Sequence, residues 1–320
     1  MKVGVLVHFY VPFRCAGSET MLHTMLKRLK EEGHEILVTA TTLGDAPYMY
    51  EYEGIRVIST NLVIAQQELR QFKPDVIITH HDNTMQGIRF GRKNRIPSVF
   101  IMHNDFDLTS KMLNLQPDMV VFNTRWIEGK FKNRVAHSVV VHPPVWAEEH
   151  ATKPGSKVTL VNLNEHKGAN ILYELAERMP HVEFMGVVGG HGVQVIREDL
   201  PNVEIVQHTD NMVDDVWSKT RILLMPSVYE SYGMAGVEAL ASGIPVLCNP
   251  TPGLVESQGC FGLFINRDDT QEWVNQIERL LDDKEWKAAS VLAKKRSKEI
   301  NPQAELDAWV QEVGRLVQCR

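Results

Sequence analysis

The chain has 320 residues, of which 43% are hydrophobic and 23% charged, and its 34 basic and 40 acidic side chains give a net charge of −6. This composition is typical of a globular protein of about two domains. The four cysteines form no C-x-x-C pair and the net charge is negative, which disfavours a zinc site, a disulfide framework and general nucleic-acid binding.

The first half of the chain alternates short apolar runs with helical segments. A strand is expected at Lys2–His8 and an amphipathic helix at Glu19–Glu32, followed by a stop at Gly33. Further strands are expected at Glu35–Ala40, Val76–Thr79, Ser98–Met102, Met119–Phe122 and Ser138–Val141. This βα alternation predicts a parallel, doubly wound sheet.

Residues 143–155 are rich in proline, glycine and charge, which predicts a domain linker, and the alternation then restarts. The second set of strands is expected at Lys157–Val161, Val182–Val187, Val203–Val206, Arg221–Met225 and Pro245–Cys248. Helices are expected at Ala169–Met179, at Gly233–Ala241 and from about Thr270 onward.

The expected fold class is therefore α/β, with two Rossmann-like, doubly wound domains. The domains are expected at residues 1–150 and 151–300, and a helix over 301–320 could pack back on the first of them. Open α/β sheets bind ligands outside the carboxyl ends of their strands. Two such domains facing a cleft would place both sets of strand ends on it, so residues that follow strands are the candidates for a site.

The apolar start of the chain, Met1–Phe13, lacks a basic n-region and a small-residue cleavage site, so we expect a first strand rather than a signal peptide. The apolar runs are too short for a membrane-spanning helix, and a cytoplasmic protein is expected. Two helices carry basic clusters, Lys27 to Lys30 and Arg89 to Arg95. They are either solvated faces or a weak docking surface for an anionic acceptor or a membrane.

Two loops after strands contain residues suited to binding an anion. In the loop from His8 to Glu19, Gly17 opens onto a helix, which predicts either a phosphate or sugar loop or a plain turn with Ser18 as N-cap. Lys167, next to a glycine at a helix start, is either a surface lysine or a group that neutralises a diphosphate.

The most informative segment runs from Pro226 to Pro245. Glu230 lies in a loop after a strand, and Glu238 lies in the following helix. Gly233 permits a tight turn whose free N–H groups would point at an anion. The two carboxylates would then hold hydroxyl groups on either side of a bound phosphate.

This segment resembles the E-x7-E region of the family 4 (group 1) retaining glycosyltransferases, which have the GT-B fold. The similarity extends along most of the chain: Gly17-Ser18-Glu19 matches the first glycine loop, His103 the histidine after a strand, Asn123-Thr124 the segment before a short helix, His142-Pro143-Pro144 the domain crossing, Lys167-Gly168 the K-G pair, and Thr251 to Glu256 the last loop.

The resemblance implies a donor-binding role for the second domain. Lys167 would neutralise the diphosphate of a nucleotide-diphosphate sugar, and the Gly233–Met234 turn would donate N–H groups to the distal phosphate. Glu238 would hold the ribose hydroxyls, and Glu230 those of the transferred sugar. Lys167 and Glu230 would thus act in catalysis, although Glu230 is not expected to be a covalent nucleophile.

In the first domain, which is the acceptor side, His103 would contact the sugar near the reacting face. His103, Glu230 and Lys167 would together be the catalytic residues. Gly17 and Ser18 would let the first loop approach the phosphate and the acceptor. His80 and His81 follow a strand, where they either touch the acceptor or only cap the strand.

Some residues depart from the family pattern or suggest other sites. Asn162 stands where the family has an arginine five residues before the lysine, so one phosphate contact is missing or replaced. The Asp105-Phe-Asp107 triplet is a D-x-D, which other glycosyltransferases use to bind manganese, although such triplets are common by chance. The glycine-rich segment Gly186 to Gly192 is expected to shape the nucleotide-base pocket.

The resemblance implies retaining transfer of a sugar from a nucleotide-diphosphate sugar to an acceptor hydroxyl. No metal and no cofactor are expected, because a lysine and helix dipoles can stabilise the leaving diphosphate. The alternatives are a GT-B nucleotide-sugar epimerase or hydrolase, or an inactive sugar-nucleotide-binding protein, which Asn162 suggests. The expected partners are the donor and an unknown acceptor, and the docking-surface interpretation of the basic helices adds a peripheral contact with the inner face of a membrane. No motif identifies the base, the sugar, the acceptor or the oligomeric state.

Overall fold

The computed structural model describes residues 1–42, 44–190 and 192–318. The chain forms two compact units, one comprising Met1–Pro144 and Pro302–Arg320 and the other Val145–Asn301. The first boundary lies at Pro144 rather than near residue 150. The reason is that the short helix after it, α6 (Ala147–His150), packs on the second unit, where the His150 carbonyl accepts a hydrogen bond from Ser242 Oγ at 2.9 Å.

The first unit contains one eight-stranded sheet, in the order β3-β4-β2-β1-β5-β6-β7-β8. Its strands are β1 (Lys2–Val7), β2 (Glu35–Ala40), β3 (Met49–Tyr52), β4 (Ile55–Ser59), β5 (Val76–His80), β6 (Ser98–Met102), β7 (Met119–Phe122) and β8 (Ser138–Val140). All neighbouring pairs are parallel except β3 and β4. The expected parallel, doubly wound sheet is confirmed.

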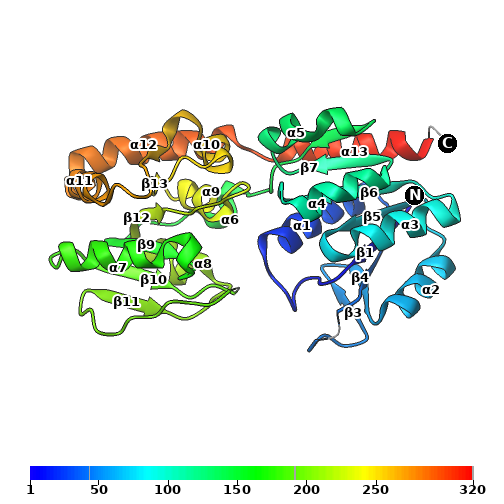
Figure 1. The fold of residues 1–320 in the computed structure, drawn as a ribbon, viewed down its shortest axis with the longest axis horizontal. Coiled ribbons are helices and arrows are strands. Elements are labelled where there is room, and N and C mark those ends of the chain that lie inside the picture. The colour runs from blue at the N-terminus through cyan, green and yellow to red at the C-terminus, as the bar shows by residue number, and fades with distance from the viewer. Residues whose placement is uncertain (43, 191, 319–320) are drawn as a thin grey trace. The chain divides into compact units, whose positions relative to one another are not determined.

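The helices of the first unit are α1 (Gly17–Glu31), α2 (Leu62–Phe72), α3 (Thr84–Asn94), α4 (Asp107–Lys111), α5 (Arg125–Phe131) and α13 (Gln303–Gln318). Short 3-10 turns lie between a helix and a strand at η1 (His81–Asn83), η2 (Met112–Leu115) and η3 (Lys132–Arg134). The last helix, drawn in red, lies beside elements from the start of the chain (Figure 1). Its Trp309 is fully buried and donates a hydrogen bond to the Met25 carbonyl of α1 at 3.1 Å.

The second unit contains a six-stranded parallel sheet, in the order β11-β10-β9-β12-β13-β14. Its strands are β9 (Lys157–Val161), β10 (Phe184–Val187), β11 (Val203–Val206), β12 (Thr220–Met225), β13 (Val246–Cys248) and β14 (Leu263–Phe264). Besides α6, its helices are α7 (Ala169–Arg178), α8 (Met212–Asp215), α9 (Met234–Ala241), α10 (Pro252–Gln258), α11 (Thr270–Leu281) and α12 (Asp283–Glu299), with 3-10 turns η4 (Glu165–Lys167), η5 (Trp217–Lys219) and η6 (Gly259–Phe261).

Both sheets reverse their strand order at one point. In the first unit the reversal lies between β1 and β5, and in the second between β9 and β12. At such a point the following helices leave to opposite faces of the sheet, which opens a crevice at the carboxyl ends of the two strands. These strand ends are therefore where a ligand site is expected in each unit.

The antiparallel hairpin β3–β4 was not predicted from the sequence. Its outer strand has half-exposed and fully exposed residues, because it forms the edge of the sheet. The two-residue turn consists of Glu53 and Gly54, which both have positive φ (47° and 75°), the backbone that a tight hairpin requires. Glu-Gly is a weaker turn signal than Asn-Gly, and the short edge strand carries no apolar alternation.

The central strands are almost wholly buried, which explains their continuous apolar runs. The buried threonines among them are satisfied locally: Thr39 and Thr79 donate hydrogen bonds to the carbonyls of Val5 and Leu6, both at 2.8 Å. In the described ranges, no helix combines the length and the apolar character needed to cross a membrane.

Candidate functional site

The second unit brings Lys167 and Glu230 together at its point of strand reversal. Lys167 lies in η4, directly after β9, and Glu230 lies in the loop after β12. Lys167 Nζ is 2.5 Å from Glu230 Oε1, which also accepts a hydrogen bond from Ser227 Oγ at 2.9 Å. The side chains are 32% and 11% exposed, so the pair is partly open to the solvent. An ammonium group has three N–H donors, which leaves two of them available to an anion.

Two glycines allow the loops around this pair to approach each other. Gly168, after Lys167, has φ of 106°, and a Cβ there would lie 2.3 Å from Pro226 Cγ in the loop that carries Glu230. Gly233 has φ of 86°, and a Cβ there would lie 2.6 Å from Leu254 Cδ2. Any other residue at these positions would strain the backbone and push the loops apart.

Helix α9 begins directly after Gly233 and has no side chain capping its N-terminus. In the part of the chain that the structure describes, no protein acceptor meets the N–H groups of Met234 and Ala235. The N-terminus of a helix carries a partial positive charge and unpaired donors, which suits it to an anion. The expected turn at Gly233–Met234 therefore has the backbone that the sequence analysis assigned to it.

Glu238 lies on α9, one turn below its N-terminus. Burial raises the pKa of its carboxyl group to about 7. Its Oε2 is 4.0 Å from His150 Nδ1, and burial lowers the pKa of His150, so this contact is not an ion pair at neutral pH. Among the described residues the carboxylate thus has no cationic partner at neutral pH, and its side chain remains 15% exposed.

Asn162 occupies a left-handed backbone conformation, with φ of 71°, at the end of β9. Its Oδ1 accepts a hydrogen bond from Gln194 Nε2 at 2.9 Å, and Gln194 Oε1 accepts one from the N–H of Gly189 at 2.8 Å. Asn162 therefore connects the loop after β9 to the loop after β10, and asparagine tolerates the left-handed backbone better than arginine does. Of the glycine-rich segment beyond it, position 191 lies outside the described residues.

Arg267, which the sequence analysis did not identify, lies beneath the Lys167–Glu230 pair. It follows β14, and its guanidinium donates hydrogen bonds to the carbonyls of Glu165 (2.9 Å), His166 (3.4 Å) and Pro226. The backbone N–H of Arg267 also donates to Asn249 Oδ1 at 3.2 Å, and Asn249 Nδ2 donates to the Ser227 carbonyl at 2.9 Å. These bonds join the loop before Lys167 to the loop before Glu230.

Replacing Arg267 with alanine is expected to lower the stability of the second unit by about 2 kcal/mol, because hydrogen bonds from a charged donor contribute about 1.5–3 kcal/mol. The midpoint of urea unfolding measures the change. Arg279→Ala is the matched control, since Arg279 forms only an exposed pair with Glu285 at 3.7 Å and should change stability by less than about 0.5 kcal/mol. Equal effects of the two substitutions would contradict this role for Arg267.

The first unit gathers four histidines at the carboxyl ends of three adjacent strands. His8 follows β1, His80 ends β5, His81 opens η1, and His103 follows β6. His80 Nδ1 and His103 Nε2 are 2.8 Å apart and share a hydrogen bond, and the rings of His81 and His103 stack with centroids 4.8 Å apart. The structure thus brings His80, His81 and His103 together, as their positions after strands suggest.

These histidines are neutral at physiological pH. Burial, with a smaller effect of the neighbouring imidazoles, lowers the pKa of His80 and that of His103 well below the ordinary value, and burial lowers that of His81 to about 4. His80 has no exposed surface, whereas His81 is half-buried and reaches the solvent. Asn123 Nδ2 donates to the His103 carbonyl at 2.9 Å and holds that segment in place.

Gly17 and Ser18 form the start of α1, next to this cluster. The N-cap is Ala16, and Ser18 Oγ instead donates to Glu19 Oε2 at 2.8 Å, so the interpretation of Ser18 as an N-cap is wrong. The reason is that the helix begins at Gly17, one residue before Ser18. Glu19 is only 3% exposed, and burial raises the pKa of its carboxyl group.

The aspartates of the D-x-D triplet have other partners or positions. Asp105 forms an ion pair with Lys130, and Asp107 is the first residue of α4. Neither belongs to a group of metal-ligating side chains in the described ranges. The geometry does not favour a manganese site at this triplet.

The two basic helices differ in how their charges are used. In α1, Lys27 pairs with Glu53, Arg28 pairs with Glu32 (2.6 Å) and Asp307 (2.9 Å), and Lys30 donates to the Gly54 carbonyl. In α3 and at its C-cap, Arg89, Lys93 and Arg95 are exposed. Of these two clusters, the described residues pair the cations of α1 and leave these three side chains in solvent.

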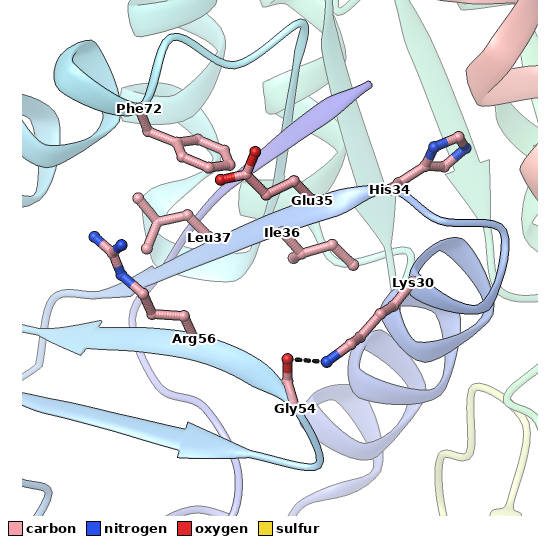
Figure 2. A pocket seen from close by; sticks show the side chains of 8 residues that line it. All are labelled: Lys30, His34, Glu35, Ile36, Leu37, Gly54, Arg56 and Phe72. Atoms are coloured by element: carbon pink, nitrogen blue, oxygen red, sulfur yellow. Dashed lines mark hydrogen bonds between the residues drawn. The ribbon is translucent and has the colours of Figure 1, made fainter.

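A pocket of about 300 Å³ lies elsewhere in the first unit, at the amino ends of β2 and β4. Its lining residues are Lys30, His34, Glu35, Ile36, Leu37, Gly54, Arg56 and Phe72 (Figure 2). Figure 2 shows Lys30 reaching the Gly54 carbonyl, so the Lys30 ammonium group of this pocket already donates a hydrogen bond within the protein. Because ligands of parallel sheets bind at the carboxyl ends of strands, we do not assign the site to this pocket.

Two family models match consecutive parts of this chain. The model described as Glycosyltransferase Family 4 matches residues 16–161, and the model described as Glycosyl transferases group 1 matches residues 158–283. The D-inositol 3-phosphate glycosyltransferase of Corynebacterium aurimucosum is 36% identical over 70 residues, which are 21% of this chain and 17% of that protein. The match thus spans less than a fifth of that relative's length.

Solved structures resemble the whole chain. Sucrose-phosphate synthase from Thermosynechococcus elongatus has a TM-score of 0.82 at 15% identity and covers 100% of both chains. HepE of Anabaena, solved in complex with UDP-glucose, has a TM-score of 0.76 at 16% identity and covers 98% of this chain and 100% of that one. At these identities the likeness shows the fold alone, which is the expected GT-B fold. With both family models matched in sequence order across residues 16–283, the chain belongs to the family 4 (group 1) glycosyltransferases.

Proposed function

We propose that the protein transfers a sugar from a nucleotide-diphosphate sugar to an acceptor hydroxyl, with retention of configuration and without a metal ion on the diphosphate. The observation that carries the proposal is the convergence of Lys167, Glu230 and the N-terminus of α9 at one end of β9 and β12. Together they offer an ammonium group and unpaired N–H donors for phosphates, and a carboxylate for sugar hydroxyls.

These groups suit the charge that develops during transfer. Cleavage of the sugar–phosphate bond places positive charge on the anomeric carbon and negative charge on the leaving diphosphate. Lys167 and the N–H groups of Met234 and Ala235 would stabilise that negative charge, because they are held in place before the reaction. Glu230 would orient the sugar through its hydroxyls while its own position is fixed by Ser227.

The remaining assignments complete the proposed site. Glu238 would accept hydrogen bonds from the ribose hydroxyls, and Arg267 would position the loops without touching the donor. In the first unit, His103 would contact the sugar, and Gly17, Ser18 and His81 would lie near the acceptor. The exposed basic residues of α3 would allow peripheral contact with an anionic membrane.

The first experiment is a thermal-shift measurement against UDP, GDP, ADP and dTDP. UDP is the first choice, because the similar HepE was solved with UDP-glucose. A nucleotide at about 100 times its dissociation constant should stabilise the protein by about 2.7 kcal/mol. The shift should persist in EDTA, because the groups proposed for the diphosphate are a lysine and backbone N–H groups.

Product analysis then separates the reactions that share such a donor site. Glycoside formed on an acceptor with the donor's anomeric configuration supports the proposal. An isomerised sugar would indicate an epimerase, free sugar a hydrolase, and binding without turnover of any donor an inactive sugar-nucleotide-binding protein. No shift with any nucleotide would contradict the proposed donor site.

A further inference from the structure

The histidine cluster of the first unit has a geometry that the proposed sugar transfer does not require. His80, His81 and His103 each offer a ring nitrogen, and these atoms all lie within 4.8 Å of one another. The residues come from the ends of β5 and β6, which are neighbours in the sheet, so the backbone fixes their spacing. Three imidazoles with nitrogens this close are a ligand set of the kind that binds zinc with one open position, once the His81 ring turns from its stacked place on His103 to aim its lone pair at the ion.

The backbone at His81 is held in an unusual conformation that keeps its ring beside those of His80 and His103. Its φ is 50°, in the left-handed region that non-glycine residues seldom adopt. At this position the chain turns from β5 into η1, and the His81 ring lies against the ring of His103 rather than in solvent. Strain of this kind clusters at functional sites.

The cluster also contains buried ring nitrogens without a hydrogen-bond partner. Within the described ranges, His80 Nε2 and His8 Nδ1 are both buried and unpartnered, and His80 has no exposed surface. Unsatisfied buried polar atoms are rare in folded proteins, and here one of them leaves His80 Nε2 able to take up the ring proton when Nδ1 binds an ion. We propose that His80, His81 and His103 bind one divalent transition-metal ion, with Zn²⁺ as the best match to the ligand set.

The ligand chemistry selects the class of ion. Neutral imidazoles suit zinc, copper, nickel and cobalt, whereas magnesium, calcium and manganese prefer oxygen ligands. Ligation by both His80 and His103 requires the proton shared between them to move to the other nitrogen of its ring. When the proton is on His80, it moves from Nδ1 to the unpartnered Nε2: one N–H bond is broken, another is formed, and the net charge of the ring is unchanged.

Carboxylates near the cluster would support such an ion. Oxygen atoms of Glu19 lie within 4.8 Å of ring nitrogens of His8 and His80, which places a carboxylate behind a ligating histidine. Carboxylates in this position orient metal-bound histidines and raise their basicity.

Metal binding here does not use Lys167, Glu230 or α9, the groups of the proposed donor site that belong to the other unit. Ligation would engage the ring of His103, which the proposed function assigns to the sugar. Transfer activity is therefore expected from the metal-free protein. This expectation rests on the proposed function, whereas the metal binding itself does not. The experiment below measures binding and does not depend on it.

The test is titration of the full chain, freed of any histidine tag and stripped with EDTA, with ZnCl₂ in a calorimeter and with CoCl₂ followed by visible absorption. We expect saturable binding of about one ion per chain and the absorption of low-symmetry, near-tetrahedral Co²⁺. His81→Asn should weaken binding by at least about 100-fold, because loss of a supporting residue alone costs about 10–100-fold. Asparagine tolerates the left-handed backbone at this position, so the variant should fold.

His181→Asn is the matched control, because His181 is an exposed histidine of the second unit that pairs with Glu278 at 2.9 Å. It should bind as the unmodified chain does, and circular dichroism confirms that both variants are folded. His103→Gln, a separate variant that removes another of the three metal-binding histidines, should reproduce the effect of His81→Asn. Absence of saturable binding, or equal affinity in His81→Asn and His181→Asn, would overturn the proposal.

Discussion

Replacing Lys167 with alanine should lower kcat/KM for the nucleotide-sugar by about 10²–10³-fold, the usual effect of removing one group that stabilises developing negative charge. Lys167 Nζ already lies 2.5 Å from Glu230 Oε1, so its position is set before the donor binds. The loss should appear in kcat as well as in KM, because the charge on the diphosphate grows as the bond to the sugar breaks. Steady-state kinetics with the donor found by thermal shift measure both constants.

Lys157→Ala is the matched control for this substitution. Lys157 lies at the opposite, amino end of the same strand, β9, and forms its own ion pair with Glu204. Its removal takes away the same charge from the same sheet. It should leave kcat within about twofold of the value of the unmodified protein, because solvent screens a charge at the far end of the strand. If Lys167→Ala kept full activity, the assignment of the diphosphate to this loop would be wrong.

Replacing Glu238 with alanine should weaken nucleotide binding by about 10–100-fold, since a hydrogen bond to a charged acceptor contributes about 1.5–3 kcal/mol. The carboxylate is buried on α9 and its pKa is about 7. In the unmodified protein, nucleotide affinity should therefore rise between pH 6 and pH 8 as Glu238 ionises and becomes the stronger acceptor. Calorimetric titration at several pH values measures this dependence, which the Glu238→Gln variant should lack.

The same raised pKa predicts an opposite effect on the stability of the ligand-free protein. The folded state holds the Glu238 proton up to about pH 7, whereas the unfolded chain releases it near 4.5, so stability falls as pH rises through this interval. Glu238→Gln removes the cost of a buried charge and should gain up to about 3 kcal/mol over the unmodified chain at pH 8. Glu174→Gln is the control, because Glu174 is exposed and pairs with Arg178. It should change neither the pH dependence of nucleotide affinity nor the stability.

Much of the second unit could be predicted from its sequence. The strands around Val158 and Leu224 are continuous apolar runs, and each is followed by a short loop with a glycine, which predicts where the ligand side of the sheet lies. Lys167 and Glu230 stand in those loops, so their proximity follows from the parallel order of the strands. The sequence does not predict that the two side chains contact each other, because that depends on the approach of Gly168 to Pro226.

Arg267 shows what local pattern cannot reveal. Its acceptors are carbonyls near residues 165 and 226, which lie about 100 and 40 positions away in the chain. Backbone carbonyls are identical in every residue, so no motif marks them as partners. The strand that precedes Arg267 contains only Leu263 and Phe264, too few residues to show a period.

The histidine cluster was only partly predictable for a related reason. His80, His81 and His103 stand at strand ends and were identified as candidates, but His8 and Glu19 were not connected to them. Their proximity depends on the reversal of strand order between β1 and β5, which brings the first and fourth parallel strands side by side. That order is a property of the whole sheet and not of any segment.

The second unit is one continuous stretch, Val145–Asn301, whereas the first is completed only by α13 after it. A ribosome therefore finishes the second unit before it has supplied the helix whose Trp309 packs on α1. Domains fold as units during synthesis. The part of the chain that is made first is thus the last to be completed, because the side of α1 that contacts Trp309 lacks this neighbour until α13 has been made.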